Sequence, residues 1–266
     1  MGDVYTHGHH ESVLRSHSWR TAENSAGYLL GELRPGMSLL DVGCGPGTIT
    51  LDLAERVAPG RVVGLDSAAD IVDRAEQLRH GRGIGNASFC VGDVYRLVIA
   101  DSSFDVVHAH QVLQHLREPV AALEEMRRVL RSDGLLAVRD SDYAAKFWVP
   151  RDERLDRWME LYHQVTRANG AEADAGRFLP GWVRSAGFSQ LRVSSSTWTF
   201  ADVDTCRWWG ELWADRTQLS SFATQAVGYG LSDPDELASI ADAWREWSVD
   251  PGAMIVIVGV EVLARK

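Results

Sequence analysis

Three closely spaced glycines are the residues of this chain whose arrangement most directly implies chemistry. Gly43, Gly45 and Gly47 occupy alternate positions after Asp41, and an amphipathic run covers residues 49–57. Glycine has no Cβ and tolerates unusual backbone dihedrals, so a ligand can lie against bare backbone in such a loop. A helix that begins just after the loop presents free N–H groups and a positive dipole end to an anionic group. The pattern predicts a ligand-binding loop between a buried strand and a helix.

The third glycine of a dinucleotide-binding pattern is missing from this loop. Dinucleotide sites prefer G-x-G-x-x-G, with an acid about twenty residues later for the ribose. Counted from Gly43, Thr48 stands where the third glycine is expected, although Asp66 does follow at the end of the second apolar run. Asp41 also disfavours a dinucleotide, because an acid on a buried strand needs a polar partner there. An NAD-dependent oxidoreductase is therefore the weaker alternative.

Short apolar segments alternate with helical patterns from residue 39 onward, which indicates βαβ units and a parallel sheet. We expect strands at residues 39–42, 62–65, 87–91, 104–108, 135–139, 191–200 and 254–263. We expect helices at residues 21–33, 49–57, 68–79, 119–130, 153–168, 178–186, 202–227 and 234–247. The last two strands would suit an antiparallel edge on the sheet.

The composition narrows the class of protein. The chain has 266 residues and a net charge of -10, which suits one large α/β domain and argues against binding to nucleic acid or to anionic membranes. No stretch is apolar enough to span a bilayer and the first residues lack a signal core, so we expect a cytoplasmic protein. The three cysteines are far apart, and we predict no disulfide and no metal site.

The region around the glycine loop resembles motif I of the class I S-adenosylmethionine-dependent methyltransferases. The resemblance continues in order, since residues 62–67, 92–94, 104–116 and 128–136 are similar to the later motifs of that family. The resemblance covers about residues 37–142. Within the family, these motifs most resemble those of the branch that includes the quinone-biosynthesis methyltransferases and many small-molecule methyltransferases. The resemblance implies S-adenosyl-L-methionine as the cofactor and S-adenosyl-L-homocysteine as the product.

The resemblance also implies an architecture for the whole chain. The fold would be α/β, a Rossmann-like seven-stranded, mostly parallel sheet with helices on both faces, an antiparallel last strand and helical cap insertions. Residues 1–266 would form one methyltransferase domain. Within it, residues 1–35 would be an N-terminal lid or helix, 37–142 the cofactor-binding core, and 143–187 and 201–250 the cap elements.

The resemblance assigns roles to residues at the ends of the predicted strands. Asp66 would accept the two ribose hydroxyls, Asp93 and the Val94 N–H would contact the adenine, and the glycines would lie against the amino-acid end of the cofactor. The predicted cofactor-binding residues are Asp41, Gly43, Gly45, Gly47, Thr48, Asp66, Ser67, Asp93, Val94, His110, Gln111 and His115.

Methyl transfer from a sulfonium is an in-line displacement, so positioning can supply most of the acceleration. A base is needed only where the acceptor must lose a proton, and His110 is the candidate catalytic residue for that task. The many tryptophans of the second half suggest a small apolar or aromatic acceptor. The predicted acceptor pocket contains Tyr5, His9, His10, Tyr143, Phe147, Trp148, Trp208 and Trp209.

Other functions stay open at this point. Binding motifs do not prove turnover, so a non-catalytic S-adenosylmethionine sensor is an alternative. A nucleic-acid methyltransferase is opposed by the acidic charge and by His110-Gln111, where enzymes that methylate base amino groups carry an Asn/Asp-Pro-Pro-aromatic motif. We expect a small-molecule substrate, no nucleic-acid or membrane partner, and we consider a homodimer through the last strand.

Overall fold

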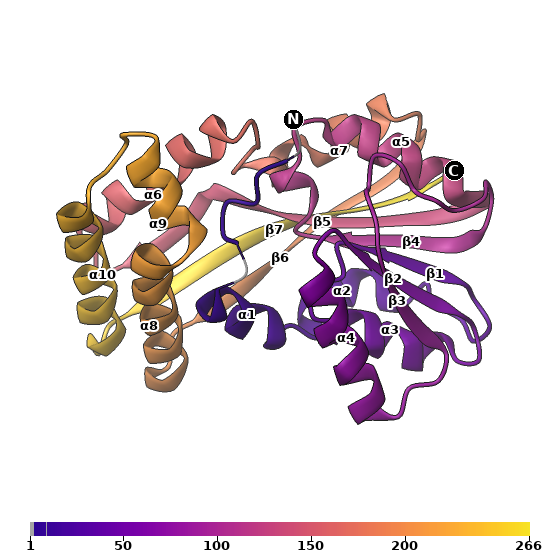
Figure 1. Ribbon diagram of the computed structural model, residues 1–266, viewed down its shortest axis with the longest axis horizontal. Helices are drawn as coiled ribbons and strands as arrows, with labels where there is room; N and C mark the ends of the chain where they lie inside the picture. Colours follow the sequence, from indigo (N-terminus) through magenta and orange to yellow (C-terminus); the bar gives the residue numbers. More distant parts are fainter. Residues whose placement is uncertain (1–2, 9) are drawn as a thin grey trace.

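The computed structural model describes residues 3–8 and 10–266, and a seven-stranded sheet runs through its centre (Figure 1). The strands are β1 Leu39–Val42, β2 Val62–Asp66, β3 Ala87–Val91, β4 Phe104–His110, β5 Leu130–Val149, β6 Gln190–Phe200 and β7 Met254–Arg265. Their order is β3-β2-β1-β4-β5-β7-β6. The pairs among β1 to β5 are parallel, whereas β7 is antiparallel to both β5 and β6. The predicted fold, with its last strand inserted antiparallel, is confirmed.

Helices cover both faces of the sheet. They are α1 Glu11–Ser18, α2 Ala22–Leu30, α3 Thr48–Val57, α4 Ala69–Arg82, the 3-10 turn η1 Leu113–His115, α5 Pro119–Val129, α6 Glu153–Ala168, α7 Ala175–Ser185, α8 Val203–Leu219, α9 Ser221–Gly228 and α10 Pro234–Val249. Successive strand residues point to opposite faces. On β1, Leu39 therefore joins the core packed against α2 and α3, and Leu40 joins the core packed against α5 and α7.

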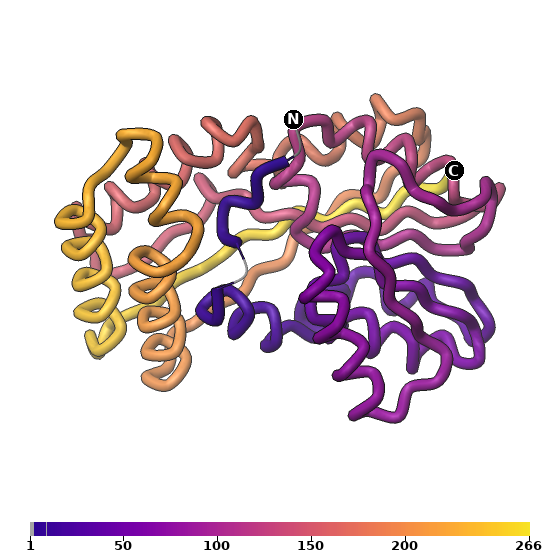
Figure 2. Tube along the Cα trace, in the orientation of Figure 1, coloured from indigo at the N-terminus to yellow at the C-terminus, as the bar shows by residue number. Residues whose placement is uncertain are grey.

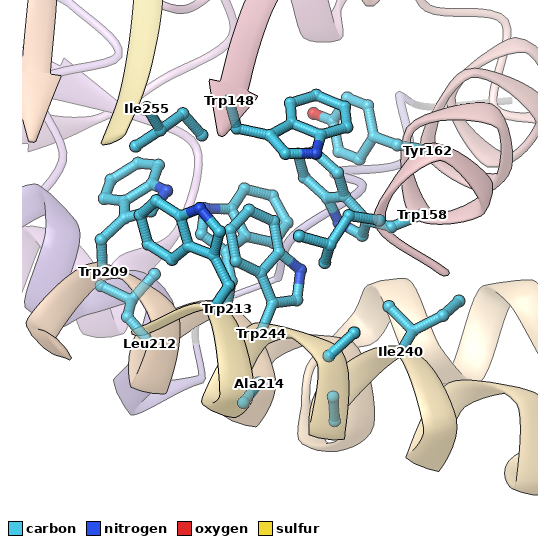
Figure 3. Close-up of a cluster of buried hydrophobic side chains, with 14 of the residues drawn as sticks. Trp148, Trp158, Tyr162, Trp209, Leu212, Trp213, Ala214, Ile240, Trp244 and Ile255 are labelled. Carbon is cyan, nitrogen blue, oxygen red and sulfur yellow. The ribbon is translucent and has the colours of Figure 1, made fainter. Parts of the chain in front are cut away.

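A separate aromatic core lies where β5, β6 and β7 extend beyond the shorter strands. There α6, α8, α9 and α10 form what we call the helical layer (Figure 1). Figure 3 shows the rings of Trp158, Trp213 and Trp244 gathered between these helices. The Trp158 ring centroid lies 4.6 Å from that of Trp213 and 4.9 Å from that of Trp244, both edge to face. Such geometry adds about 0.5–1.5 kcal/mol per pair to the effect of burial.

The N-terminal segment, by which we mean the described residues before α2, runs between the helical layer and the half of the molecule that carries α2 to α4 (Figure 2). Val13 and Leu14 of α1 are buried. The guanidinium of Arg216, on α8, donates to the Ser12 carbonyl at 3.1 Å and to the Ser16 hydroxyl at 2.9 Å. This segment is thus tied to the helical layer by buried polar contacts.

Several elements differ in extent from those expected, and packing or pairing explains three of the differences. β5 continues to Val149 because it keeps pairing with β7 beyond a bulge between Asp142 and Phe147. The helical run at residues 202–227 breaks at Ser220, whose extended backbone and hydroxyl cap α9. Residues 11–18, a mostly polar stretch outside the helix expected at residues 21–33, form α1 because α8 supplies a surface for their few apolar side chains.

Candidate active site

One cavity of about 710 Å3 lies where the carboxyl ends of β1, β2 and β4 face α1 and α8. Small-molecule sites commonly measure about 300–1,000 Å3, and in α/β sheets they lie where the strand order reverses. Here that reversal is between β1 and β4. The predicted residues that line the cavity are Asp41, Gly43, Gly45, Thr48, Asp66, Ser67, Asp93, Val94, His110, Gln111 and His115, with Tyr5, Tyr143 and Trp209.

All three loop glycines hold positive φ angles that other residues rarely adopt, and at two of them a Cβ would also meet a neighbouring side chain. Gly43 has a φ of +66°, and a Cβ there would collide with a methyl group of Val112. Gly47 has a φ of +85°, and a Cβ there would lie 2.8 Å from Cζ of Phe89. Gly47 does not line the cavity; it is the left-handed residue that starts α3. Its effect is to aim the N-terminus of α3, beginning at Thr48, toward the ligand space.

Asp66 stands at the end of β2 with each carboxylate oxygen already oriented. The Gly45 N–H donates to Oδ2 at 3.0 Å and the Ala68 N–H donates to Oδ1 at 3.1 Å. Each oxygen keeps a further lone pair, so the group can accept two hydroxyl hydrogen bonds. Asp93 is oriented in the same way by the Tyr95 N–H at 2.9 Å.

Asp41 borders the cavity, but its carboxylate is occupied behind the loop. The Thr50 hydroxyl donates to Oδ2 at 2.5 Å, and Nδ1 of His108 donates to Oδ1 at 2.7 Å. All three side chains are buried. These are the polar partners that a buried strand acid requires. Asp41 therefore ties β1, α3 and β4 together under the glycine loop rather than offering a vacant acceptor to a ligand.

His110 belongs to β4 itself, because the strand runs two residues beyond its expected end. Both of its ring nitrogens are buried, with no hydrogen-bond partner in the described part of the chain. Burial, with the positive charges of Arg20 and Arg139, lowers the pKa of His110 well below its usual range. The ring is thus a neutral imidazole beside the cavity. The next residue, Gln111, accepts a hydrogen bond from Nη2 of Arg20 at 2.7 Å.

Tyr5 and α1 close one side of the cavity. The Tyr5 hydroxyl lies 3.4 Å from Nε2 of His17, and its ring meets that of His115 edge to face at 4.8 Å. Thr48 donates its hydroxyl to the His17 carbonyl at 3.3 Å, which links the start of α3 to the N-terminal segment. Burial lowers the pKa of His115 to about 3, and Arg20 contributes to the shift. Like His110, this side chain is neutral.

The far end of the cavity is aromatic. Nε2 of His7 lies 3.0 Å from the Tyr162 hydroxyl and 3.4 Å from the Tyr143 hydroxyl. The tyrosine rings are stacked with a centroid distance of 3.9 Å. Trp209 and Trp213 of α8 complete this wall. We call this end the aromatic half, and the part formed by the loop, Asp66 and Asp93 the glycine-loop half.

Several residues predicted for the acceptor pocket lie elsewhere. Phe147 is 47% exposed, because the bulge in β5 turns it outward. Trp148 is buried inside the aromatic core instead. Trp208 packs on Phe200 outside the cavity, and the His10 ring caps α1 by accepting from the Ser12 N–H. His9 lies outside the described residues.

Further residues line the cavity that no sequence motif indicated. They are His7, His17, Trp19, Arg20, Lys146, Trp198, Trp213 and Arg216. His7 and His17 belong to a histidine-rich N-terminus, which has histidines at positions 7, 9, 10 and 17. Lys146 also had a signal, because it is one of only two lysines in the chain.

Within residues 3–8 and 10–266, three or more His, Cys, Asp or Glu side chains nowhere come together as metal ligands would. No helix in the same residues combines the length and apolar character needed to cross a membrane.

Known proteins resemble this chain over most of its length. The model of the family described as "Methyltransferase domain" matches residues 33–197. An uncharacterized methyltransferase of Schizosaccharomyces pombe is 32% identical, with 98% of this chain and 96% of that protein covered. Demethylmenaquinone methyltransferase of Geobacillus stearothermophilus is also 32% identical, over 43% of this chain and half of its own length.

A solved structure shares the architecture. The YcgJ protein from Bacillus subtilis superposes with a TM-score of 0.61 and 16% sequence identity, covering 97% of this chain and 99% of its own. At that identity the likeness concerns the fold. The matched fold includes the helical layer as well as the sheet.

Proposed function

The chain belongs to the class I S-adenosylmethionine-dependent methyltransferases, and we propose that it methylates a small molecule that enters the aromatic half of the cavity. The observation that supports this is that one cavity contains both the oriented Asp66 and the Trp209–Trp213 wall. A cofactor and an acceptor can therefore meet without leaving the protein. The lid and cap roles expected for the N-terminal segment and the helical layer are part of this proposal.

The residues of the glycine-loop half fit S-adenosylmethionine. Asp66 has free lone pairs for two ribose hydroxyls, and the same charge would repel a 2′-phosphate. The left-handed Gly43 and the N-terminus of α3 form a cradle for the amino-acid end. We place the carboxylate of that end near Arg20, whose Nε is buried without a partner in the described residues.

When bound, the cofactor supplies a methyl group on a sulfonium, which needs no further activation. The protein must then hold the acceptor in line and exclude water, and the buried rings of Tyr143, Trp209 and Trp213 suit both tasks. We assign proton acceptance, where the acceptor has a proton to lose, to the neutral ring of His110. Its unpartnered nitrogens are available for that hydrogen bond.

Calorimetry tests the cofactor part of this proposal. S-adenosylhomocysteine and NAD are titrated separately into the purified chain. We expect saturable binding of S-adenosylhomocysteine and no measurable binding of NAD. A folded protein that binds neither, or only NAD, would contradict the proposal. Release of S-adenosylhomocysteine from S-adenosylmethionine on adding an acceptor then distinguishes an enzyme from a sensor.

A further inference from the structure

Two buried cations line the aromatic half, and the described residues show neither of them in an ion pair. Lys146 is 9% exposed and Arg216 is 4% exposed. Arg216 donates from Nη2 to an uncharged carbonyl and an uncharged hydroxyl, while its Nε has no partner in the described part of the chain. Buried cations without counter-charges are costly, so natural proteins rarely keep them unless something compensates them.

A chain of contacts shows that the two cations face one space. Nζ of Lys146 lies 2.8 Å from the centre of the Tyr143 ring. The Tyr143 hydroxyl is 3.4 Å from His7, whose ring is 5.9 Å from that of Trp213. The guanidinium of Arg216 lies over that same tryptophan at 4.5 Å. Lys146 and Arg216 both line the cavity and are connected through Tyr143, His7 and Trp213.

The carboxylates nearest to Lys146 are already engaged by other groups. Asp142 accepts two hydrogen bonds from the guanidinium of Arg177, one of them at 2.7 Å. Asp174 lies 2.9 Å from the His163 ring and accepts from a backbone N–H. Neither carboxylate forms an ion pair with Lys146 in the described residues, although both favour its charged form from a distance. An anion from outside the chain would therefore be its first directly paired counter-charge.

Away from Arg20, the ribose and adenine end proposed for the glycine-loop half has the opposite charge. Its ligand-facing side chains include the carboxylates of Asp66 and Asp93. An anionic ligand is repelled at that end and attracted at the other. The difference in charge orients an anionic acceptor so that its charged group points away from the adenosine site.

We propose that Lys146 and Arg216 form a receptor for an anionic oxygen group on the methyl acceptor, a carboxylate or an ionised phenol or enol. This inference rests on the proposed methyltransferase function and adds the chemical class of the acceptor. The Trp209 and Trp213 rings would contact a planar apolar body, and the cations would pair with the oxyanion. The acceptor is then an amphiphilic acid and not a purely apolar molecule.

Proton uptake should accompany binding. Burial, together with the charge of Arg216, lowers the pKa of Lys146 well below its usual range, so its ammonium form is less stable than that of an exposed lysine. Arg20 also lowers this pKa, whereas Asp142 and Asp174 raise it. An arriving anion stabilises the ammonium form, and the fraction of Lys146 that was neutral then takes a proton from solvent.

The test uses the whole protein saturated with S-adenosylhomocysteine. Benzoate is titrated against benzamide, and 4-nitrophenolate against 4-nitroanisole, each in two buffers of different ionisation enthalpy. We expect each anion to bind at least about tenfold more tightly than its neutral partner, with proton uptake. The benzoate and phenolate arms show which oxyanion is preferred.

Variants test whether the preference for anions depends on Lys146 and Arg216. K146M should reduce the affinity for the anions at least about tenfold, abolish proton uptake and raise the melting temperature, because it removes an unpaired amine. R216Q should also weaken anion binding. The control is K266M, since the other lysine donates only to the Arg128 and Leu130 carbonyls at the chain end.

The outcomes separate this inference from the function on which it rests. Equal binding of the anions and their neutral partners, no response to any of the four, or an unaltered preference in K146M would overturn it. In those cases normal binding of S-adenosylhomocysteine would leave the methyltransferase proposal intact. Loss of S-adenosylhomocysteine binding by the folded wild-type chain would instead reject the proposed function.

Discussion

The two halves of the cavity are built in different ways. The glycine-loop half uses backbone: left-handed glycines, a helix N-terminus and carboxylates whose oxygens are oriented by N–H groups. The aromatic half uses side chains of segments far apart in the chain, from His7 through Tyr143 and Lys146 to Arg216. A cofactor that never changes suits the first construction. An acceptor that differs between relatives suits the second, because side chains can be replaced without disturbing a sheet.

Both halves contain buried polar groups that lack a partner in the described residues. Under the glycine loop, the Asp41 carboxylate accepts from Thr50 and from Nδ1 of His108, but Nε2 of His108 has no partner there. In the aromatic half, buried nitrogens of His7 and Arg216 lack partners in the same part of the chain. Unsatisfied buried groups are normally avoided. Because these groups belong to different segments, we expect each half to receive its own part of the bound ligands and mutations in the two halves to have separable effects.

The largest effect is expected from replacing Trp213 by alanine. This fully buried ring contacts Trp158, Trp244 and the guanidinium of Arg216, so its removal should lower the free energy of unfolding by about 3–5 kcal/mol. Affinity for an acceptor should fall, while the folded fraction should still bind S-adenosylhomocysteine. Urea unfolding and calorimetry measure both quantities.

The control for Trp213→Ala is Trp208→Ala, which removes a neighbouring tryptophan outside the cavity. It should destabilise the protein less and leave acceptor affinity unaltered. If Trp213→Ala reduced the affinity for cofactor and acceptor equally, the separation of the two halves would be wrong.

The next largest effect is expected from Asp66→Ala. Two hydrogen bonds to a charged acceptor, each worth about 1.5 kcal/mol or more, would be lost, so S-adenosylhomocysteine should bind at least about 100-fold more weakly. Stability should change little, because the backbone N–H groups of Gly45 and Ala68 are only partly buried. Calorimetry measures the affinity, and Asp70→Ala, an exposed neighbour on α4, is the control. Retained affinity would remove Asp66 from the proposed ribose site.

A smaller effect is expected from Asp140, which is fully buried on β5. Its Oδ1 accepts from the Gln114 N–H, its Oδ2 has no partner in the described residues, and burial raises its pKa to about 7. The unfolded carboxyl ionises near pH 4 and the folded one near pH 7, so this group's contribution is lost as the pH rises between those values. Between pH 5 and pH 8 the loss should be about 2 kcal/mol.

Asp140→Asn tests that pH dependence, because the amide resembles the protonated acid and does not ionise. The unfolding free energy of the wild type should fall relative to that of the variant as the pH rises from 5 to 8. Parallel curves for the two proteins would show that Asp140 is ionised in the folded state.

How much of the site could be predicted depends on how far apart its residues lie along the chain. Asp41 to Asp66 lie within one βαβ unit, so the glycine spacing and the strand-ending acid were visible together, and the strand pattern predicted the sheet. Lys146 and Arg216 are brought together only by the extension of β5 and the packing of α8. No local periodicity of the sequence indicates that these two side chains line the same cavity. Burial and missing partners, which single them out, are properties of the folded chain.

The same limit explains why only some of the aromatic residues predicted for the acceptor pocket line the cavity. Tyr143 and Phe147 both follow the predicted fifth strand, and both were expected to line the cavity. Alternation along a regular strand would point them the same way. The bulge between Asp142 and Phe147 breaks that alternation, so Tyr143 is buried in the aromatic half and Phe147 faces outward.

Phe147→Ala should therefore have the smallest effect of the set. An exposed ring contributes little to folding, so we expect a change in unfolding free energy of less than about 0.5 kcal/mol and unaltered affinity for S-adenosylhomocysteine and benzoate. Tyr143→Ala is the matched variant, because it removes a buried ring that contacts Lys146 and His7. If both variants weakened benzoate binding equally, the bulge would not separate the two positions, and the acceptor site would extend over the outer surface of β5.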